Sequence, residues 1–73
     1  MLNEIKFVEV QSSNVVSIGY ENNNLYVNYK SGTYKYENVD QSVYESLLNS
    51  ESKGRFMNEH IKPKYTYYRV DLI

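Results

Sequence analysis

The sequence predicts an α+β protein with a three- to four-stranded antiparallel sheet, and with one long and one short helix packed on one face. Three observations support this fold class. Segments rich in β-branched and aromatic residues alternate with turn signals up to about residue 38. Two stretches with apolar residues at helical spacing follow, and a final stretch alternates again. A chain of 73 residues is enough for one domain, which we expect to span residues 1–73.

The first three strands are expected to form a β-meander. We place them at Val15–Tyr20, Leu25–Lys30 and Thr33–Asn38. The asparagines at 22–24 and the Ser31-Gly32 pair separate them, and both are typical of tight turns.

Loop length fixes the register of these strands. A four-residue loop through the asparagines places Ile18 opposite Val27 and Tyr20 opposite Leu25. A two-residue loop at Ser31-Gly32 places Tyr29 opposite Tyr34 and Val27 opposite Tyr36. The predicted core face then consists of Val16, Ile18, Tyr20, Leu25, Val27, Tyr29, Tyr34 and Tyr36. The predicted water-facing side consists of Val15, Ser17, Gly19, Tyr26, Asn28, Lys30, Thr33, Lys35 and Glu37.

A helix is expected after the meander. Asp40 is a suitable N-cap residue for a helix that runs to about Asn49. The residues that form its apolar stripe, which should pack on the sheet, are Val43, Tyr44, Leu47 and Leu48.

A shorter second helix is expected to begin at Ser52, and Pro63 forbids its continuation. Its apolar positions are Phe56, Met57 and Ile61. Gly54 lies in its first turn, at a cost of about 1 kcal/mol relative to Ala. This cost suggests that close backbone approach or helix-to-helix contact is needed there.

Both ends of the chain alternate between apolar and polar residues. Tyr65–Leu72 predicts a return strand, with Thr66, Tyr68, Val70 and Leu72 on one side and Tyr65, Tyr67 and Arg69 on the other. Ile5–Val10 alternates as well, so residues 1–10 are a candidate extra edge or oligomerisation strand. The sequence leaves open whether this segment pairs with the C-terminal strand or with another subunit.

Composition excludes several classes of site. The chain has no cysteine and one histidine, so we expect no disulfide, no metal and no cofactor. It has no run of about 18 apolar residues, and Met1-Leu2-Asn3-Glu4 lacks the basic and apolar regions of a signal peptide. We therefore expect a soluble intracellular protein without membrane contact.

The net charge of −1 conceals an asymmetry. Residues 1–52 carry three lysines against seven carboxylates, whereas residues 53–69 carry five cations against Glu59 alone. Local charge of this sign attracts anionic partners, although five cations over seventeen residues are common on small domains and then form a solvated face.

Short signatures along the chain resemble those of the KTSC domain, a family named after a C-terminal extension of some lysyl-tRNA synthetases. They are Ser12-Ser13-Asn14-Val15, Ile18-Gly19-Tyr20, Leu25-Tyr26-Val27, Gly32-Thr33-Tyr34-Lys35-Tyr36, Val43-Tyr44, and Ser52-Lys53-Gly54-Arg55-Phe56-Met57-Asn58 through Ile61 and Tyr65. The resemblance covers about Val10 to Tyr68. It departs from the family pattern at Asp40, Ser50 and Met57, where the family usually has Pro, Ala and an aromatic residue.

The resemblance implies a fold more than an activity, and it supplies no catalytic residue. The family includes appendages of a tRNA-charging enzyme and small free-standing bacterial and phage proteins. It therefore implies a cytoplasmic location, in a bacterium or in the host of a phage, and RNA as a candidate ligand. On these grounds we predict a non-enzymatic binding domain that recognises RNA or a nucleotide.

Two surfaces are candidate ligand sites. The first is the start of the second helix at Ser52, where Lys53, Arg55, Lys62 and Lys64 could hold a phosphate. The alternative is structural, with Ser52, Gly54, Phe56 and Asn58 serving as cap, close-contact glycine, apolar contact and turn residue.

The second candidate surface is the outer face of the sheet. Tyr26, Lys30 and Lys35 would lie there near Tyr65, Tyr67 and Arg69 if the last strand joins the meander. Such a face could stack unpaired bases, although a plain solvated sheet face is an equal alternative. The register instead assigns Tyr34 and Tyr36 a structural role in the core.

Catalysis has little support, because His60 has no Ser or Cys nucleophile at a recognisable spacing. The remaining alternative to a ligand-binding domain is an interaction protein. It would be a homo-oligomer, or a phage-encoded inhibitor that docks on a host protein or sequesters a nucleotide signal. Alternating terminal segments favour this alternative, because exposed strands can pair with another chain.

Overall fold

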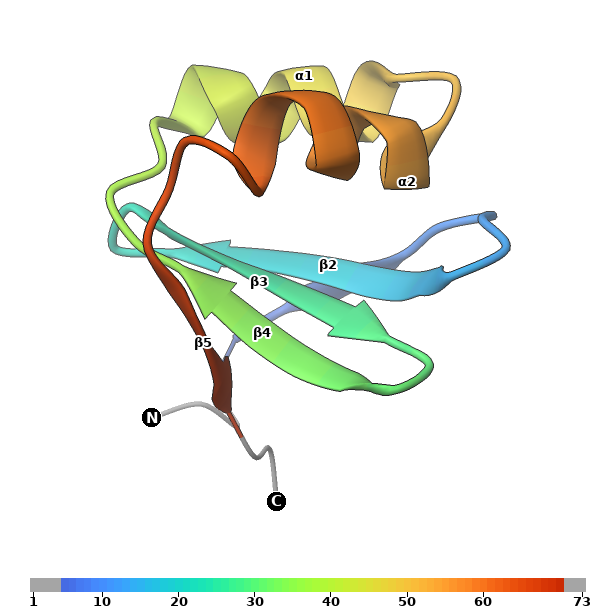
Figure 1. Cartoon of the computed structure of the whole chain (residues 1–73), viewed down its shortest axis with the longest axis horizontal. Coiled ribbons are helices and arrows are strands. Elements are labelled where there is room, and N and C mark those ends of the chain that lie inside the picture. Colours follow the sequence, from blue (N-terminus) through green and yellow to red (C-terminus); the bar gives the residue numbers. More distant parts are fainter. Residues whose placement is uncertain (1–4, 71–73) are drawn as a thin grey trace.

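The computed structural model describes residues 5–70 and has the predicted α+β fold, with helices covering one face of an antiparallel sheet (Figure 1). The sheet has five strands in the order β1-β2-β3-β4-β5, one more than the three to four predicted. The elements are β1 (Phe7–Glu9), β2 (Val15–Glu21), β3 (Asn24–Tyr29), β4 (Gly32–Tyr36), α1 (Gln41–Asn49), α2 (Lys53–Phe56), the π-helical turn η2 (Met57–Ile61) and β5 (Tyr67–Val70).

The predicted register between β2 and β3 is confirmed, since Ile18 pairs with Val27 and Tyr20 pairs with Leu25. Two asparagines form the turn between these strands. Asn22 and Asn23 have φ angles of 53° and 64°, and asparagine tolerates this left-handed conformation better than most residues.

The predicted register between β3 and β4 is wrong by two residues. Val27 pairs with Tyr34 rather than Tyr36, and Tyr29 pairs with Gly32. The turn is therefore centred one residue earlier than expected, and Gly32 belongs to the strand. A shift of two residues keeps every side chain on its own face of the sheet, so the division into two faces survives in these strands.

A β-bulge reverses the predicted orientation of the first two residues of β2. Val15 pairs with Tyr29 and Ser17 pairs with Asn28, which leaves Val16 as the extra residue. Val15 is consequently 1% exposed and belongs to the core, whereas Val16 is 40% exposed.

The helices begin where the sequence predicts. Asp40 precedes α1, although its side chain makes no capping hydrogen bond. The Ser52 side chain caps α2 by accepting a hydrogen bond from the backbone N–H of Arg55. Helix α2 continues directly into η2, so the two segments together have as many residues as α1.

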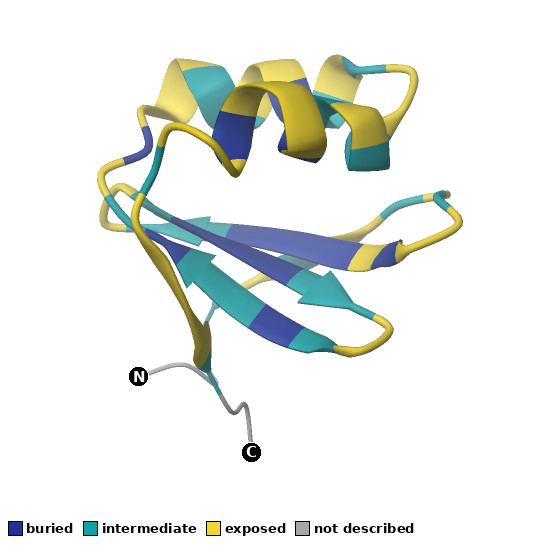
Figure 2. Cartoon of the chain, in the orientation of Figure 1, coloured by how far each residue is buried: buried dark blue, intermediate teal, exposed yellow. Residues whose placement is uncertain are grey.

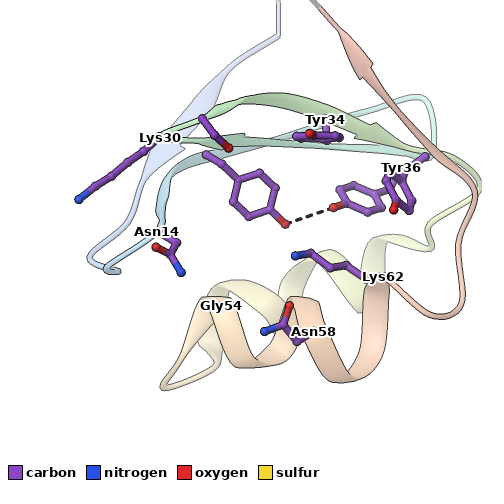
Figure 3. Close-up of a pocket in the computed structure, with 10 residues that line it drawn as sticks. Asn14, Lys30, Tyr34, Tyr36, Gly54, Asn58 and Lys62 are labelled. Atoms are coloured by element: carbon purple, nitrogen blue, oxygen red, sulfur yellow. Dashed lines mark hydrogen bonds between the residues drawn. The ribbon is translucent and has the colours of Figure 1, made fainter.

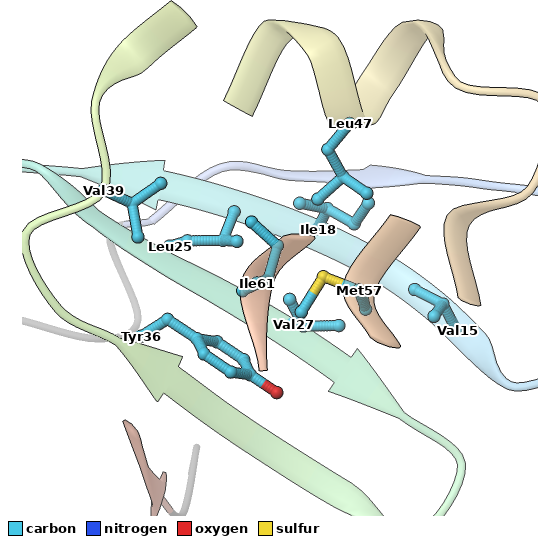
Figure 4. Packing of buried hydrophobic residues seen from close by; sticks show 9 residues of the cluster. All are labelled: Val15, Ile18, Leu25, Val27, Tyr36, Val39, Leu47, Met57 and Ile61. Atoms are coloured by element: carbon cyan, nitrogen blue, oxygen red, sulfur yellow. The ribbon is translucent and has the colours of Figure 1, made fainter. Parts of the chain in front are cut away.

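The core lies between the sheet and the helices, as the burial colouring and the close-up show (Figures 2 and 4). Its fully buried side chains are Val15, Ile18, Leu25, Val27, Tyr36, Val39, Leu47, Met57 and Ile61. Tyr20 packs against α1 and the segment before it. Its ring stacks on that of Tyr44 with ring centroids 4.9 Å apart, and its hydroxyl donates a hydrogen bond to the carbonyl oxygen of Val39.

The outer face of the sheet is partly covered, and this contradicts the prediction that Tyr26 faces water. Tyr26 is 6% exposed. In the sheet, Gly19 pairs with Phe7 on one side and with Tyr26 on the other. A Cβ atom at Gly19 would lie 2.7 Å from Cγ2 of Ile5 and 3.2 Å from the Phe7 ring. The N-terminal segment therefore packs closely across this face.

The ends of the sheet are β1 and β5. The sequence left open whether residues 1–10 pair with the C-terminal strand or with another subunit. In the structure β1 pairs with β2, so pairing with the C-terminal strand is wrong. β5 pairs with β4, as the second candidate surface required. Residues 1–4 of the N-terminal segment, and Asp71 and Leu72 of the predicted return strand, lie outside the described residues. Within residues 5–70, no helix is long and apolar enough to cross a membrane.

Candidate ligand-binding cleft

The pairing of β5 decides which face of the sheet carries the C-terminal tyrosines. Tyr36 pairs with Tyr67 and Tyr34 pairs with Arg69, so Tyr67 and Arg69 share the helix-facing side. Lys35 pairs instead with Tyr68 on the outer face. The predicted outer platform of Tyr26, Lys35 and the C-terminal residues therefore does not form, because its members are divided between two faces or buried.

A cleft of about 380 Å³ opens between the sheet and α2–η2 (Figure 3). Ligand sites in proteins commonly have volumes of roughly 300–1,000 Å³. The lining residues, which define what we call the tyrosine cleft, are Asn14, Tyr29, Lys30, Ser31, Tyr34, Tyr36, Gly54, Asn58, Lys62 and Tyr67.

Four tyrosine rings form the wall of the cleft that the sheet provides. Tyr29 meets Tyr34 edge-on, with ring centroids 5.7 Å apart and planes at 76°. Tyr34 meets Tyr67 at 6.0 Å and 62°, and Tyr67 lies 5.2 Å from Tyr36 at 32°. These spacings fall within the range of about 4.5–7 Å for favourable aromatic pairs. The wall is therefore one connected aromatic surface.

Two of these tyrosines are joined through their hydroxyl groups, which lie 3.1 Å apart (Figure 3). Burial raises the pKa of Tyr36, and its hydrogen bond with Tyr29 raises it further. Burial also raises the pKa of Tyr29, and the hydrogen bond with Tyr36 opposes that rise. Both hydroxyls consequently stay protonated at neutral pH and offer the cleft neutral polar groups.

The raised pKa of Tyr36 predicts a loss of stability in alkali. An unfolded tyrosine ionises near pH 10, whereas the folded protein holds the proton of Tyr36 more tightly. The stabilisation is therefore fully present below about pH 10 and is lost as the pH rises toward the folded pKa. Above pH 10 the contribution of Tyr36 to the free energy of unfolding should fall by about 1.4 kcal/mol per pH unit.

Urea denaturation at several pH values between about 9 and 11.5 measures this dependence. The variant Tyr36→Phe should show a pH dependence that is shallower by the same amount, because it lacks the ionisable group. An unchanged slope in Tyr36→Phe would show that Tyr36 does not hold its proton more tightly in the folded state.

The charge of the cleft is positive. Lys62 places its Nζ atom 5.4 Å from the centroid of the Tyr29 ring, a cation–π arrangement. Lys30 contributes a second cation from the turn between β3 and β4. Arg69 lies close by, and its Nη2 donates to the carbonyl oxygen of Ser31 at 3.3 Å. Among the ten described lining residues there is no Asp or Glu, so the site favours anions.

The helical wall of the cleft consists of Gly54, Asn58 and Lys62, which are spaced four residues apart. Residues at this spacing lie above one another on one helix face. Along this face the wall offers first bare backbone, then a side-chain amide and finally a cation. Lys62 was predicted as part of an anion site, whereas Gly54 and Asn58 were predicted to be structural.

The other cations of the predicted anion site do not join Lys62 in the cleft. Nζ of Lys53 donates to the carbonyl oxygen of Ser50 at 2.7 Å. Nε of Arg55 donates to the carboxylate of Glu59 at 3.0 Å, and this ion pair raises the pKa of Arg55. Lys64 lines a separate groove of about 250 Å³ between α1 and η2. Phe56, His60 and Tyr65 line that groove as well, together with Ser42, Val43 and Ser46.

Sequence reasoning missed several residues of the tyrosine cleft. Asn14 and Ser31 lie in turns, and neither was singled out as a ligand contact. Tyr29, Tyr34 and Tyr36 were assigned to the core, although Tyr29 and Tyr34 are only half-buried. The available signal was the spacing of Gly54, Asn58 and Lys62, which places polar groups opposite the tyrosine face rather than an apolar stripe.

Comparison with known proteins gives consistent matches over most of the chain. The model of the KTSC domain family matches residues 11–65. An uncharacterized protein from Stutzerimonas stutzeri is 42% identical over 71 residues, which cover 92% of this chain and 100% of that protein. A protein from Tsukamurella paurometabola is 37% identical over 59 residues, covering 77% of this chain and 88% of that protein.

One solved structure shares the fold closely. The crystal structure of a KTSC domain protein from Yersinia pestis matches with a TM-score of 0.87 and 32% sequence identity. The match covers 90% of this chain and 97% of that chain.

Proposed function

The chain belongs to the KTSC domain family, and from this premise we propose that it is a binding domain that takes an anionic, nucleotide-type ligand into the tyrosine cleft. One observation carries the proposal. Four connected tyrosine rings face a helix that presents Lys62, and no carboxylate stands among the ten described residues of the cleft.

The cleft offers what each part of a nucleotide requires. A base has a flat π-surface, and stacking on an aromatic side chain contributes roughly 1–3 kcal/mol per base. The phosphate is attracted by Lys62 and Lys30, and an amide such as that of Asn58 can both donate and accept hydrogen bonds. A nucleotide, free or at the accessible part of an RNA, combines these groups in one molecule.

The proposed role is binding without catalysis. None of the ten described cleft residues is His, Asp, Glu or Cys, and the groups present that can act as a general acid or base are those of lysine and tyrosine. The buried hydroxyl of Tyr36 is a poor base, because burial raises its pKa. We therefore assign Tyr36 to the binding surface rather than to proton transfer.

The alternative, an oligomer formed through sheet edges, has weaker support. Within residues 5–70, β1 has three residues and β5 has four, and short edge strands are a common means of avoiding pairing with another chain. Val8, Tyr67 and Tyr68 are exposed at these edges, but Tyr67 also belongs to the cleft wall. Of these three exposed side chains, the cleft accounts for Tyr67, whereas Val8 and Tyr68 remain available to the alternative.

Titration of the protein with AMP, single-stranded RNA and tRNA tests the proposed function. With two cleft lysines neutralising phosphates, the logarithm of the association constant for single-stranded RNA should fall with the logarithm of salt concentration at a slope of about −1.4. AMP should compete with the RNA, since both would occupy the same cleft. Absence of binding, or an affinity that does not respond to salt, would contradict the proposal.

A further inference from the structure

Gly54 has no evident structural reason to be glycine. Glycine in a helix is less stable than alanine, because it loses more backbone freedom on folding. Gly54 is not among the described residues with positive φ. A Cβ atom built at this position would meet no other atom within 4 Å. Neither the backbone conformation nor packing within the described chain therefore requires glycine here.

The other two glycines differ in this respect. A Cβ atom at Gly19 would meet the side chains of Ile5 and Phe7, and Gly32 has a φ angle of 153° beside the Arg69 side chain. An added Cβ meets no neighbouring atom at Gly54 alone among the three glycines, and Gly54 lines the tyrosine cleft together with Asn58 and Lys62. The close backbone approach that the sequence predicted at Gly54 is therefore not an approach by another part of the described chain.

Gly54 lies at one end of the helical wall and Lys62 at the other. They are eight positions apart in the chain, so the end of α2 and all of η2 lie between them. Figure 3 shows Gly54 and Asn58 on this wall, with Lys62 further along it beside Tyr36. A molecule lying along the wall would meet bare backbone at one end, an amide in the middle and a cation at the other end.

We infer that the ligand lies lengthwise in the tyrosine cleft, with its flat uncharged body against the backbone of Gly54 and its anionic group at Lys62. Gly54 is then a specificity-determining residue, because the missing side chain leaves the space that the body of the ligand occupies. This inference rests on the proposed function and adds to it an orientation and a limit on size.

The variant Gly54→Ala tests the inference, with AMP, adenosine and inorganic phosphate as probes in NMR titrations of ¹⁵N-labelled protein. Alanine should raise the melting temperature by on the order of 4 °C, because it favours the helix. It should nevertheless weaken the binding of AMP and of adenosine by about tenfold, since one added methyl group in a binding pocket has roughly this effect. Binding of phosphate should not change.

Lys62→Gln should give the opposite pattern, with AMP and phosphate weakened and adenosine little affected. Ser46→Ala on α1 is the control for helix stabilisation away from the cleft, and it should leave all three affinities unchanged. In the wild-type complex, base protons of AMP should show NOEs to the Hα protons of Gly54.

The outcomes separate this inference from the proposed function. If wild-type protein binds AMP and Lys62→Gln weakens that binding, but Gly54→Ala binds AMP as tightly as wild type, the orientation is wrong while the function stands. A loss of phosphate binding in Gly54→Ala would place the anionic group at Gly54 and would also overturn the orientation. If wild-type protein binds none of the three probes, both the function and the orientation are wrong.

Discussion

Replacement of Leu47 with alanine is expected to lower the free energy of unfolding by about 2–5 kcal/mol, the usual cost of truncating a buried leucine. Leu47 is fully buried and is the only buried residue of α1. Figure 4 shows it pointing from the helix toward Ile18 on the sheet. The loss is large for a chain of 73 residues, whose total stability should be about 4–11 kcal/mol.

Leu48→Ala is the matched control, because it makes the same chemical change one residue further along the same helix. Leu48 is only partly buried against the core, so its truncation should cost less than that of Leu47. Urea denaturation followed by circular dichroism measures both variants. Equal losses in the two variants would show that α1 does not attach to the sheet mainly through Leu47.

Local signals in the sequence were sufficient to predict the order of strands, turns and helices along the chain. Asparagines at the first turn, Ser52 at the start of α2 and Pro63 after η2 act on their immediate neighbours, so their effects can be predicted without the rest of the fold. The resemblance to the KTSC domain agreed with this order of elements. The family model, the relatives and the solved structure confirm that the chain belongs to the family.

Register and burial were harder to predict, because they depend on contacts between distant segments. Val15 and Val16 are both apolar, and alternation alone could not show that a bulge turns Val15 inward. The Tyr26 side chain was predicted to be exposed to solvent, because the sequence did not decide which strand residues 5–10 pair with. Once β1 lies beside β2, Ile5 and Phe7 cover Gly19, and its neighbour Tyr26 is buried.

The candidate site was predicted in part. Lys62 and Tyr67 were both named as candidate ligand residues, but they were assigned to two different surfaces. Both line the tyrosine cleft, because the pairing of β5 places Tyr67 on the helix-facing side and because Lys62, directly after η2, lies over Tyr29. Arg55 was named with Lys62, yet it does not line the cleft and instead pairs with the carboxylate of Glu59, one helical turn away. That ion pair follows from the spacing of the two residues.

Reversal of the cleft charge is expected to abolish most ligand binding. The double variant Lys30→Glu/Lys62→Glu replaces two attractive cations with two repulsive carboxylates. Two unit charges about 4 Å apart interact by about 1 kcal/mol even in bulk water. A phosphate monoester carries a charge of about −1.5 to −2 at neutral pH, so reversal at Lys62 alone should change the interaction by about 3–4 kcal/mol. AMP binding should therefore weaken by about 100-fold or more.

The matched control is Lys35→Glu/Lys64→Glu, which changes the net charge by the same amount. Lys35 pairs with Tyr68 on the outer face, and Lys64 lines the groove between α1 and η2. Neither lysine contributes to the tyrosine cleft. Thermal unfolding of both variants would show that each is folded before binding is compared.

The affinity of these two double variants for AMP, measured side by side at low salt, tests most directly whether the tyrosine cleft is the ligand site. We predict that Lys30→Glu/Lys62→Glu loses about 100-fold or more in affinity, while Lys35→Glu/Lys64→Glu stays within about threefold of wild type, a change of less than about 1 kcal/mol. Equal losses in the two variants would show that overall charge governs binding. A larger loss in Lys35→Glu/Lys64→Glu would place the ligand on another surface.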